Sequence, residues 1–184
     1  EPDVYEKMGC PDSVIHLAWK DGFVHNSNAH MDNLSSHYKF LRNLVDAGCK
    51  NISVMGTMHE IGFYEGKIDE NTPCNPLSQY GIAKNALRQA LLTYTKDKDV
   101  NIFWLRAYYI LGDDKKNNSI FAKLLAAAEA GKKEFPFTTG KAKYDFIQVD
   151  ELAKQIVAAS TQDNYTGIIN VCSGKPVSLG DRVE

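Results

Sequence analysis

A tyrosine and a lysine lie four residues apart in the segment Tyr80-Gly81-Ile82-Ala83-Lys84. If this segment is helical, residues four apart share one face, so the phenol and the ammonium converge. A tyrosine hydroxyl has an ordinary pKa of about 10, which is too high for proton transfer at neutral pH. A lysine cation close by favours the phenolate and lowers that pKa. The pair could therefore act as an acid or base on an alcohol or carbonyl oxygen.

Thr57 is the third candidate, because it ends the apolar run 51–57. If that run is a buried parallel strand, its carboxyl end is where ligands bind in such sheets. The Thr57 hydroxyl could then hydrogen-bond the same substrate oxygen as Tyr80. Together the three residues would move a proton at that oxygen while a hydride moves at carbon. A solvated surface Tyr and Lys can also show this spacing by chance, so the surrounding sequence has to decide.

The surrounding sequence alternates short β-rich runs with longer helical patterns. We expect strands at 13–19, 51–57, 100–107, 143–149 and 167–172, and helices at 4–8, 33–47, 78–96, 119–130 and 150–160. Gly48 and Ser178 are residue types that end and begin helices, respectively. This alternation is typical of βαβ units. The predicted fold class is therefore α/β, with a doubly wound parallel sheet.

Composition and charge exclude several classes of protein. The 184 residues are 43% hydrophobic and 24% charged, with a formal net charge of -2, as in an ordinary soluble globular protein. With 21 basic and 23 acidic residues, we expect no nucleic-acid partner and no anionic membrane surface as a partner. No apolar run approaches the roughly 20 residues that span a bilayer.

The cysteines and histidines indicate neither disulfides nor metal. The four cysteines are scattered without a CxxC pair, which is the pattern of reduced thiols in a cytoplasmic protein: Cys10, Cys49, Cys74 and Cys172. His25, His30 and His37 do not show the i, i+4 spacing that places two ligands on one helical face. We therefore predict no metal site.

Longer motifs surround the three candidates and occur in order along essentially the whole chain. They are Ser-Val-Ile-His-Leu-Ala at 13–18, Asn33, Gly56-Thr57 with Gly62, Asp-Glu-Asn-Thr-Pro at 69–73, the segment 76–84, Leu105-Arg106, Gly112, and the segments 145–153 and 170–174. In these motifs the chain resembles the extended short-chain dehydrogenase/reductases, which include NAD(P)-dependent epimerases, dehydratases and reductases of nucleotide sugars. The resemblance implies a partial Rossmann fold, NAD or NADP as cofactor, a nucleotide sugar as substrate and a homodimeric parent protein.

The resemblance also implies roles for individual residues. Tyr80 becomes the catalytic acid/base, Lys84 lowers its pKa and holds the nicotinamide ribose, and Thr57 orients the substrate oxygen. The positions implied to contact the cofactor are Leu17, Ala18, Trp19, Asn33, Tyr80, Lys84, Ala107 and Tyr108. Those implied to contact the substrate are Thr57, Met58, His59, Tyr109 and Tyr144. For Asn33, ligand contact and support of the loop structure stay equally open.

One departure from the family concerns the glycines. None of the 13 glycines forms a GxG or GxxG group, so the turn that cradles the cofactor phosphates is missing. We therefore expect a fragment that lacks the glycine-rich half and a C-terminal piece, and that is itself inactive. Residues 1–112 would be the C-terminal half of the dinucleotide-binding domain and carry the catalytic motif. Residues 113–184 would be part of a smaller C-terminal substrate-binding region, with a strand and a helix that return to the core. Uncovered sheet edges would favour self-association.

Further departures concern the substrate. Tyr109 and Tyr144 stand where the family usually has Asn and Arg, which hold the substrate diphosphate. Tyrosine donates a hydrogen bond but carries no charge, which puts diphosphate binding by the usual pair in doubt. Lys143 could supply the charge instead, or could simply be solvated.

The segment 56–62, Gly-Thr-Met-His-Glu-Ile-Gly, narrows the reaction. Met58 and His59 replace the Asp-Glu pair of the family's dehydratases, which argues against 4,6-dehydration. With Glu60, the segment is similar to the GTxxExG form of 4-keto-reductases of nucleotide-linked deoxysugars. His59 could be a second acid/base or a hydrogen-bonded structural residue. The favoured function is 4-keto reduction of a deoxysugar. A nucleotide-sugar 4-epimerase and a non-catalytic NAD(P)-binding module are the alternatives.

Overall fold

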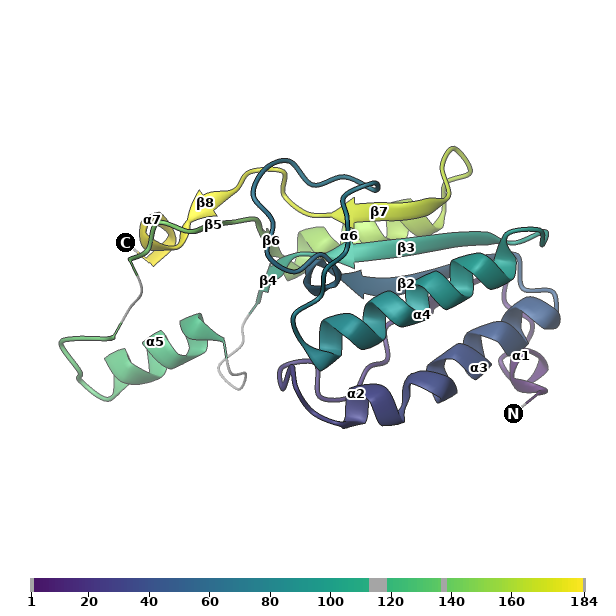
Figure 1. The fold of residues 1–184 in the computed structure, drawn as a ribbon, viewed down its shortest axis with the longest axis horizontal. Coiled ribbons are helices and arrows are strands. Elements are labelled where there is room, and N and C mark those ends of the chain that lie inside the picture. Colours follow the sequence, from purple (N-terminus) through teal and green to yellow (C-terminus); the bar gives the residue numbers. More distant parts are fainter. Residues whose placement is uncertain (1, 113–118, 137–138, 184) are drawn as a thin grey trace.

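The computed structural model describes residues 2–112, 119–136 and 139–183 (Figure 1). Its main sheet consists of four parallel strands in the order β1-β2-β3-β7. These strands are β1 (Ser13–His16), β2 (Asn51–Thr57), β3 (Asn101–Ala107) and β7 (Gly167–Val171). In the register of the sheet, Thr57 lies beside Ala107, and Ala107 lies beside Val171. The carboxyl ends of β2, β3 and β7 therefore lie at one edge of the sheet.

Helices cover both faces of the sheet. α3 (Leu34–Asp46) and α4 (Gln79–Thr95) pack on one face, and α6 (Val149–Ser160) packs on the other (Figure 1). In β3, Trp104 joins the core beneath α3 and α4, whereas Phe103 joins the core beneath α6. Successive side chains of a strand point to opposite faces, so a strand covered on both must be apolar almost throughout. The predicted α/β fold with a doubly wound parallel sheet is confirmed.

Short elements connect the larger ones. α1 (Val4–Lys7) packs on α3, α2 (Ala29–Asp32) precedes α3, and the 3-10 helix η1 (Met58–Glu60) follows β2 directly. α4 begins where the Ser78 hydroxyl accepts the Gly81 N–H at 3.2 Å. This N-cap satisfies one of the free N–H groups in the first turn, the turn that carries Tyr80.

The remaining described elements lie mostly beyond the carboxyl ends of the strands, toward the left of Figure 1. They are β4 (Tyr109–Leu111), α5 (Ile120–Glu129), β5 (Lys143–Tyr144), β6 (Phe146–Gln148), β8 (Val177–Ser178) and α7 (Leu179–Val183). β4 pairs with β6 in parallel, and β5 pairs with β8 antiparallel. α6 and β7, which belong to the region 113–184, pack into the main sheet itself.

Two predicted strands are wrong in their extent, and the first is 13–19. It ends as β1 at His16. The chain leaves the sheet there because the Trp19 indole stacks on His37 and donates its N–H to Nδ1 of His30, at 3.0 Å.

The second is 143–149, which forms two strands, β5 and β6, with different partners. Asp145 separates them. Its carbonyl accepts the Tyr109 N–H at 3.1 Å, and its carboxylate accepts the Ser173 N–H at 2.7 Å.

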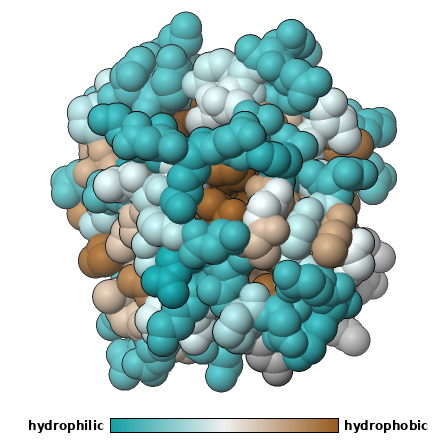
Figure 2. All heavy atoms as spheres, turned by 90° about the vertical axis from the view of Figure 1, so that its right-hand side faces the viewer, coloured by the Kyte–Doolittle hydropathy of each residue, from teal (hydrophilic) through white to brown (hydrophobic). Residues whose placement is uncertain are grey.

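The amino ends of the strands lie on the side of the molecule that faces the viewer in Figure 2. This face is largely hydrophilic, and apolar side chains gather in a hollow near its centre (Figure 2). The strand ends that carry Thr57 and Ala107 lie on the opposite side. Within the described ranges, no helix has the length and apolar character needed to cross a membrane.

Gly56 in β2 lies where two buried side chains meet the sheet. A Cβ at this position would lie 2.3 Å from Trp104 Nε1 and 2.7 Å from Glu60 Oε1. Both side chains are fully buried and hydrogen-bonded to each other, so neither can move aside. We expect Gly56→Ala to lower the free energy of unfolding by about 1–3 kcal/mol or more, as overpacking does, measured by urea denaturation.

Gly22→Ala is the control, because a Cβ there meets no atom within 4 Å. Its change in unfolding free energy should stay below about 0.5 kcal/mol. Equal urea midpoints for the two variants would contradict the packing around Gly56.

Candidate active site

Thr57, Tyr80 and Lys84 meet where α4 packs on the carboxyl end of β2. The helix comes close because Gly81 has no side chain: a Cβ there would lie 2.3 Å from the backbone oxygen of His59. Thr57 is buried, and Tyr80 is half-buried. The Thr57 hydroxyl acts as a hydrogen-bond donor that lowers the pKa of Tyr80. Lys84 lies one helical turn beyond Tyr80, so the structure brings the three predicted catalytic residues together.

Lys84 is a buried cation, only 2% exposed. Its Nζ donates a hydrogen bond to the Met55 carbonyl oxygen at 2.7 Å and lies 4.0 Å from the centre of the Trp19 ring. Burial lowers the pKa of Lys84 to about 7, against the opposing effect of the Glu60 carboxylate. The ammonium is therefore poised to gain or lose its proton near neutral pH.

The pKa of Tyr80 is raised above its ordinary value of 10.0. Burial is the main cause, the hydrogen bond from Thr57 opposes it, and the negative charge of Glu60 adds to it. The expected lowering by Lys84 is not found in this structure. The physical reason is that the Lys84 ammonium is bound to the Met55 carbonyl and the Trp19 ring.

All five histidines of the chain lie around Tyr80 and Trp19. The rings that contact Tyr80 are those of Trp19, His25, His30 and His59, with centroids 5.3–6.2 Å away. His37 stacks on Trp19 at 4.4 Å, and His16 contacts His37 at 5.2 Å. The phenol therefore lies in a wall of aromatic rings that come from separate parts of the chain.

Burial lowers the pKa of four of these imidazoles, those of His16, His25, His37 and His59. His30 accepts the Trp19 N–H at Nδ1 and lies 3.0 Å from the Val24 oxygen through Nε2, so its single proton is on Nε2. Burial lowers the pKa of His16 to about 4 and the pKa of His59 to about 4. His59 is held by ring contacts with His25 and Tyr80, and its role as a second acid/base remains a prediction.

The predicted cofactor positions line the same edge. Leu17 and Ala18 are exposed directly after β1. Asn33 donates from Nδ2 to the Ala29 carbonyl at 2.8 Å, a contact that supports α2. Ala107 is the sheet neighbour of Thr57, and Tyr108 follows it.

The two tyrosines at the predicted diphosphate positions contact each other. The rings of Tyr109 and Tyr144 lie 4.7 Å apart, and Phe146 packs beside both. Burial raises the pKa of Tyr109 to about 12, so its hydroxyl keeps its proton and remains a hydrogen-bond donor. Lys143 is exposed.

Sequence reasoning missed the contribution of His25, His30 and His37 to the site. A signal was present, because these residues lie in one short segment between a predicted strand and a predicted helix. Only the tertiary fold shows that the segment 25–37 covers Tyr80. The backbone N–H of Tyr80 donates a hydrogen bond to the His25 carbonyl at 2.9 Å.

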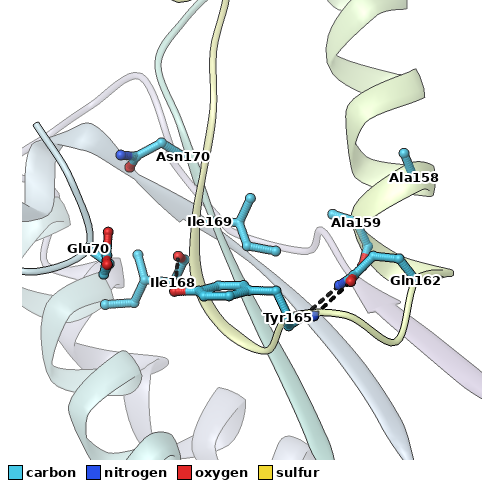
Figure 3. Close-up of a pocket in the computed structure, with 8 residues that line it drawn as sticks. All are labelled: Glu70, Ala158, Ala159, Gln162, Tyr165, Ile168, Ile169 and Asn170. Atoms are coloured by element: carbon cyan, nitrogen blue, oxygen red, sulfur yellow. Dashed lines mark hydrogen bonds between the residues drawn. The ribbon is translucent and has the colours of Figure 1, made fainter.

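A surface hollow lies elsewhere, where the end of α6 meets β7 (Figure 3). It is lined by Glu70, Ala158, Ala159, Gln162, Tyr165, Ile168, Ile169 and Asn170. Gln162 bonds to the backbone of Tyr165 through both of its amide atoms and holds the turn beside the hollow. No predicted site residue lines this hollow, so it is separate from the candidate site. Across the ranges that the structure describes, no group of three or more His, Cys, Asp or Glu side chains could hold a metal ion.

His16 makes the stability of the fold depend on pH. Its pKa is about 4 in the folded chain, against 6.5 for an unperturbed histidine. The stability that the neutral ring supports is fully present above pH 6.5 and is lost as the pH falls toward 4, because the unfolded chain takes up the proton first. We expect this group to reduce the free energy of unfolding by up to about 3 kcal/mol across that window, measured by urea denaturation.

His16→Gln keeps a polar side chain that does not titrate. Its unfolding free energy should fall less steeply than that of the unmodified chain as the pH is lowered. Parallel pH dependences for the two proteins would show that His16 is not the group responsible.

Comparison with known proteins identifies the family of this chain. The model of the NAD dependent epimerase/dehydratase family matches residues 3–172. The chain is 48% identical over 183 residues to "dTDP-6-deoxy-L-talose 4-dehydrogenase (NAD(+))" of Aggregatibacter actinomycetemcomitans, covering 99% of this chain and 66% of that protein.

Solved structures show the same fold. A UDP-N-acetylglucosamine 4-epimerase from Methanobrevibacter ruminantium M1, in complex with UDP-N-acetylmuramic acid, superposes with a TM-score of 0.84 at 21% identity, over 98% of this chain and 61% of that one. The Bordetella bronchiseptica enzyme WbmG, in complex with NAD, gives a TM-score of 0.78 at 21% identity, over 98% and 56% of the two chains. The chain thus spans between about half and two thirds of the length of these relatives. By the match of its sequence, the chain belongs to the NAD dependent epimerase/dehydratase family.

Proposed function

We propose that the chain carries the catalytic residues of an NAD-dependent oxidoreductase, which interconverts a hydroxyl and a keto group at C4 of a dTDP-linked 6-deoxyhexose. The close packing of α4 on the end of β2, which brings Tyr80 and the buried Lys84 to Thr57, carries this proposal. The 48% identity to a dTDP-6-deoxy-L-talose 4-dehydrogenase supports the substrate and the reaction. Keto reduction and alcohol oxidation are the two directions of this one step.

The three residues divide the work at the substrate oxygen. In the direction of oxidation, the Tyr80 oxygen takes the proton of the C4 hydroxyl as the C–H bond breaks. The Thr57 hydroxyl hydrogen-bonds the same oxygen and holds it against Tyr80. The Lys84 ammonium favours the phenolate whenever it is released from the Met55 carbonyl toward Tyr80. In reduction, Tyr80 returns the proton to the oxygen.

The residues present fit the nicotinamide end of NAD. The Trp19 ring contacts both the Lys84 ammonium and the Tyr80 ring, and Trp19 directly follows the exposed Leu17 and Ala18. Asn33, Ala107 and Tyr108 complete the proposed contacts. When bound, NAD accepts or donates the hydride at the sugar carbon. The phosphate-cradling glycine turn is not among the residues of this sequence, so we propose that these 184 residues alone are inactive.

The substrate contacts are proposed from position and chemistry. Met58 and His59 follow Thr57 directly and lie beside the reacting oxygen. Tyr109 and Tyr144, in ring contact with each other, offer hydroxyl donors and an apolar surface in place of a charged diphosphate clamp.

We propose the compartment and the oligomeric state of the protein from its cysteines and from one surface groove. Free cysteines in the described ranges, one of them exposed, fit the reducing cytoplasm: Cys10, Cys49, Cys74 and Cys172. A surface groove between α3 and α4, lined by Tyr38, Ala86, Gln89, Ala90, Thr93 and Tyr94, fits a homodimer of the parent protein.

Tyr80→Phe tests the proposed acid/base role in a chain of the relatives' full length. The phenyl ring keeps the ring contacts but can transfer no proton. We expect kcat for oxidation of the dTDP-6-deoxyhexose to fall by about 10²–10⁴-fold, followed as NADH absorbance.

Tyr64→Phe is the matched control, since Tyr64 is exposed on a loop. It should retain the full rate. A Tyr80→Phe protein that keeps more than about a tenth of the original rate would exclude Tyr80 as the acid/base. Binding of NAD without oxidation of any nucleotide sugar would favour a non-catalytic binding module.

A further inference from the structure

Glu60 is a fully buried carboxylate in contact with four other groups. It accepts the backbone N–H of Thr57 at 2.8 Å and the indole N–H of Trp104 at 2.9 Å. The Arg88 Nε lies 3.4 Å from its carboxylate, and the Arg106 Nη2 lies 3.6 Å away. Glu60 thereby pairs with two cations that are themselves largely or fully buried.

These contacts connect the elements that carry the proposed catalytic residues. Trp104 and Arg106 belong to β3, whereas Arg88 belongs to α4. Arg88 lies four residues beyond Lys84, so both occupy one face of that helix. Glu60 itself is in η1, directly after Thr57. A single carboxylate therefore links the end of β2, the middle of β3 and the catalytic face of α4.

The charge of Glu60 also reaches the reacting groups. It raises the pKa of Lys84 and the pKa of Tyr80, because a negative charge favours the protonated form of each. Burial raises the pKa of Glu60 itself, and the Thr57 N–H and the Arg106 guanidinium oppose that rise.

Resting on the proposed function, we infer that Glu60 is a positioning residue of the reaction. It fixes the backbone of Thr57 and the Tyr80–Lys84 face of α4 in one geometry, and it supplies the negative charge that the buried Lys84 ammonium requires. The contacts of Glu60 with Thr57 and Arg88 support the positioning role. The burial of both Glu60 and Lys84 supports the electrostatic role.

Other titratable groups face the same residues. Lys84 faces His16 of β1 and His37 of α3, Tyr80 faces His25, His30 and His59, and the guanidinium groups of Arg88 and Arg106 both lie on the sulfur of Cys74. The pKa values of His16, His25, His37 and His59 are lowered. In a pH–rate profile, the changes in rate above about pH 7, which we call its limbs, therefore report the titration of Tyr80 and Lys84 as a coupled pair.

Two variants that change opposite charges test the inference in a chain of the relatives' full length. Glu60→Gln removes the negative charge and should shift both limbs of the kcat/KM profile to lower pH by about one unit. It should also lower kcat by about tenfold or more, with a smaller change in KM, because the reacting groups lose alignment. Arg88→Gln leaves the carboxylate less neutralised and should shift both limbs to higher pH.

Trp104→Phe is the control, because it removes one hydrogen bond to Glu60 and no charge. It should lower the urea midpoint and leave the limbs in place. Shifts in the same direction for Glu60→Gln and Arg88→Gln, or limbs that do not move in either, would overturn the inference. If Glu60→Gln does not fold, the upward shift in Arg88→Gln decides alone.

A separate measurement distinguishes failure of this inference from failure of the proposed function. An unmodified full-length protein that oxidises no dTDP-sugar would contradict the function. The pKa of Lys84 can still be followed by NMR of ¹³C-labelled lysine, with the resonance assigned from Lys84→Arg. A lower Lys84 pKa in Glu60→Gln supports the role of the Glu60 charge, and an unchanged pKa contradicts it.

Discussion

The site is organised around one buried cation, the ammonium of Lys84. An ammonium that is 2% exposed must be compensated, because an unpaired charge inside a protein is strongly destabilising. The Met55 carbonyl and the Trp19 ring provide close contacts, and Glu60 provides negative charge at longer range. These groups come from β2, the loop after β1 and η1. Compensation of the Lys84 charge therefore fixes how α4 packs on the carboxyl ends of the strands.

The aromatic rings around Tyr80 explain why its phenol keeps its proton. Burial among these rings raises the pKa of Tyr80, and the Thr57 hydroxyl offsets only part of that rise. A positively charged nicotinamide bound beside the phenol would favour the phenolate by simple electrostatics. In this arrangement the phenolate would be populated mainly when the hydride acceptor is in place, which would couple proton transfer to cofactor binding.

Long elements could be predicted from the sequence because their periodicity is strong. The strand 51–57 and the helix 78–96 agree with β2 and α4, and the Tyr80–Lys84 spacing placed both side chains on one face. Elements of three or four residues, such as α2, η1 and β4, are too short to show a period.

The clustering of the five histidines and the hydrogen bond from Lys84 to the Met55 carbonyl depend on contacts between segments far apart in the sequence. No local sequence pattern predicts these contacts. Glu60 was recognised in a motif, but its pairing with Arg88 and Arg106 required the packing of η1 between α4 and β3.

The proposed reaction moves a hydride to or from the C4 carbon of a nucleotide-linked sugar. It can be followed by supplying a full-length protein with NAD and a dTDP-6-deoxyhexose deuterated at C4, and then locating the deuterium by mass spectrometry. We expect one deuterium in each NADH formed and a keto group at C4 of the sugar. Deuterium that stays on the sugar without net formation of NADH, as an epimerase would leave it, would exclude the proposed dehydrogenase reaction.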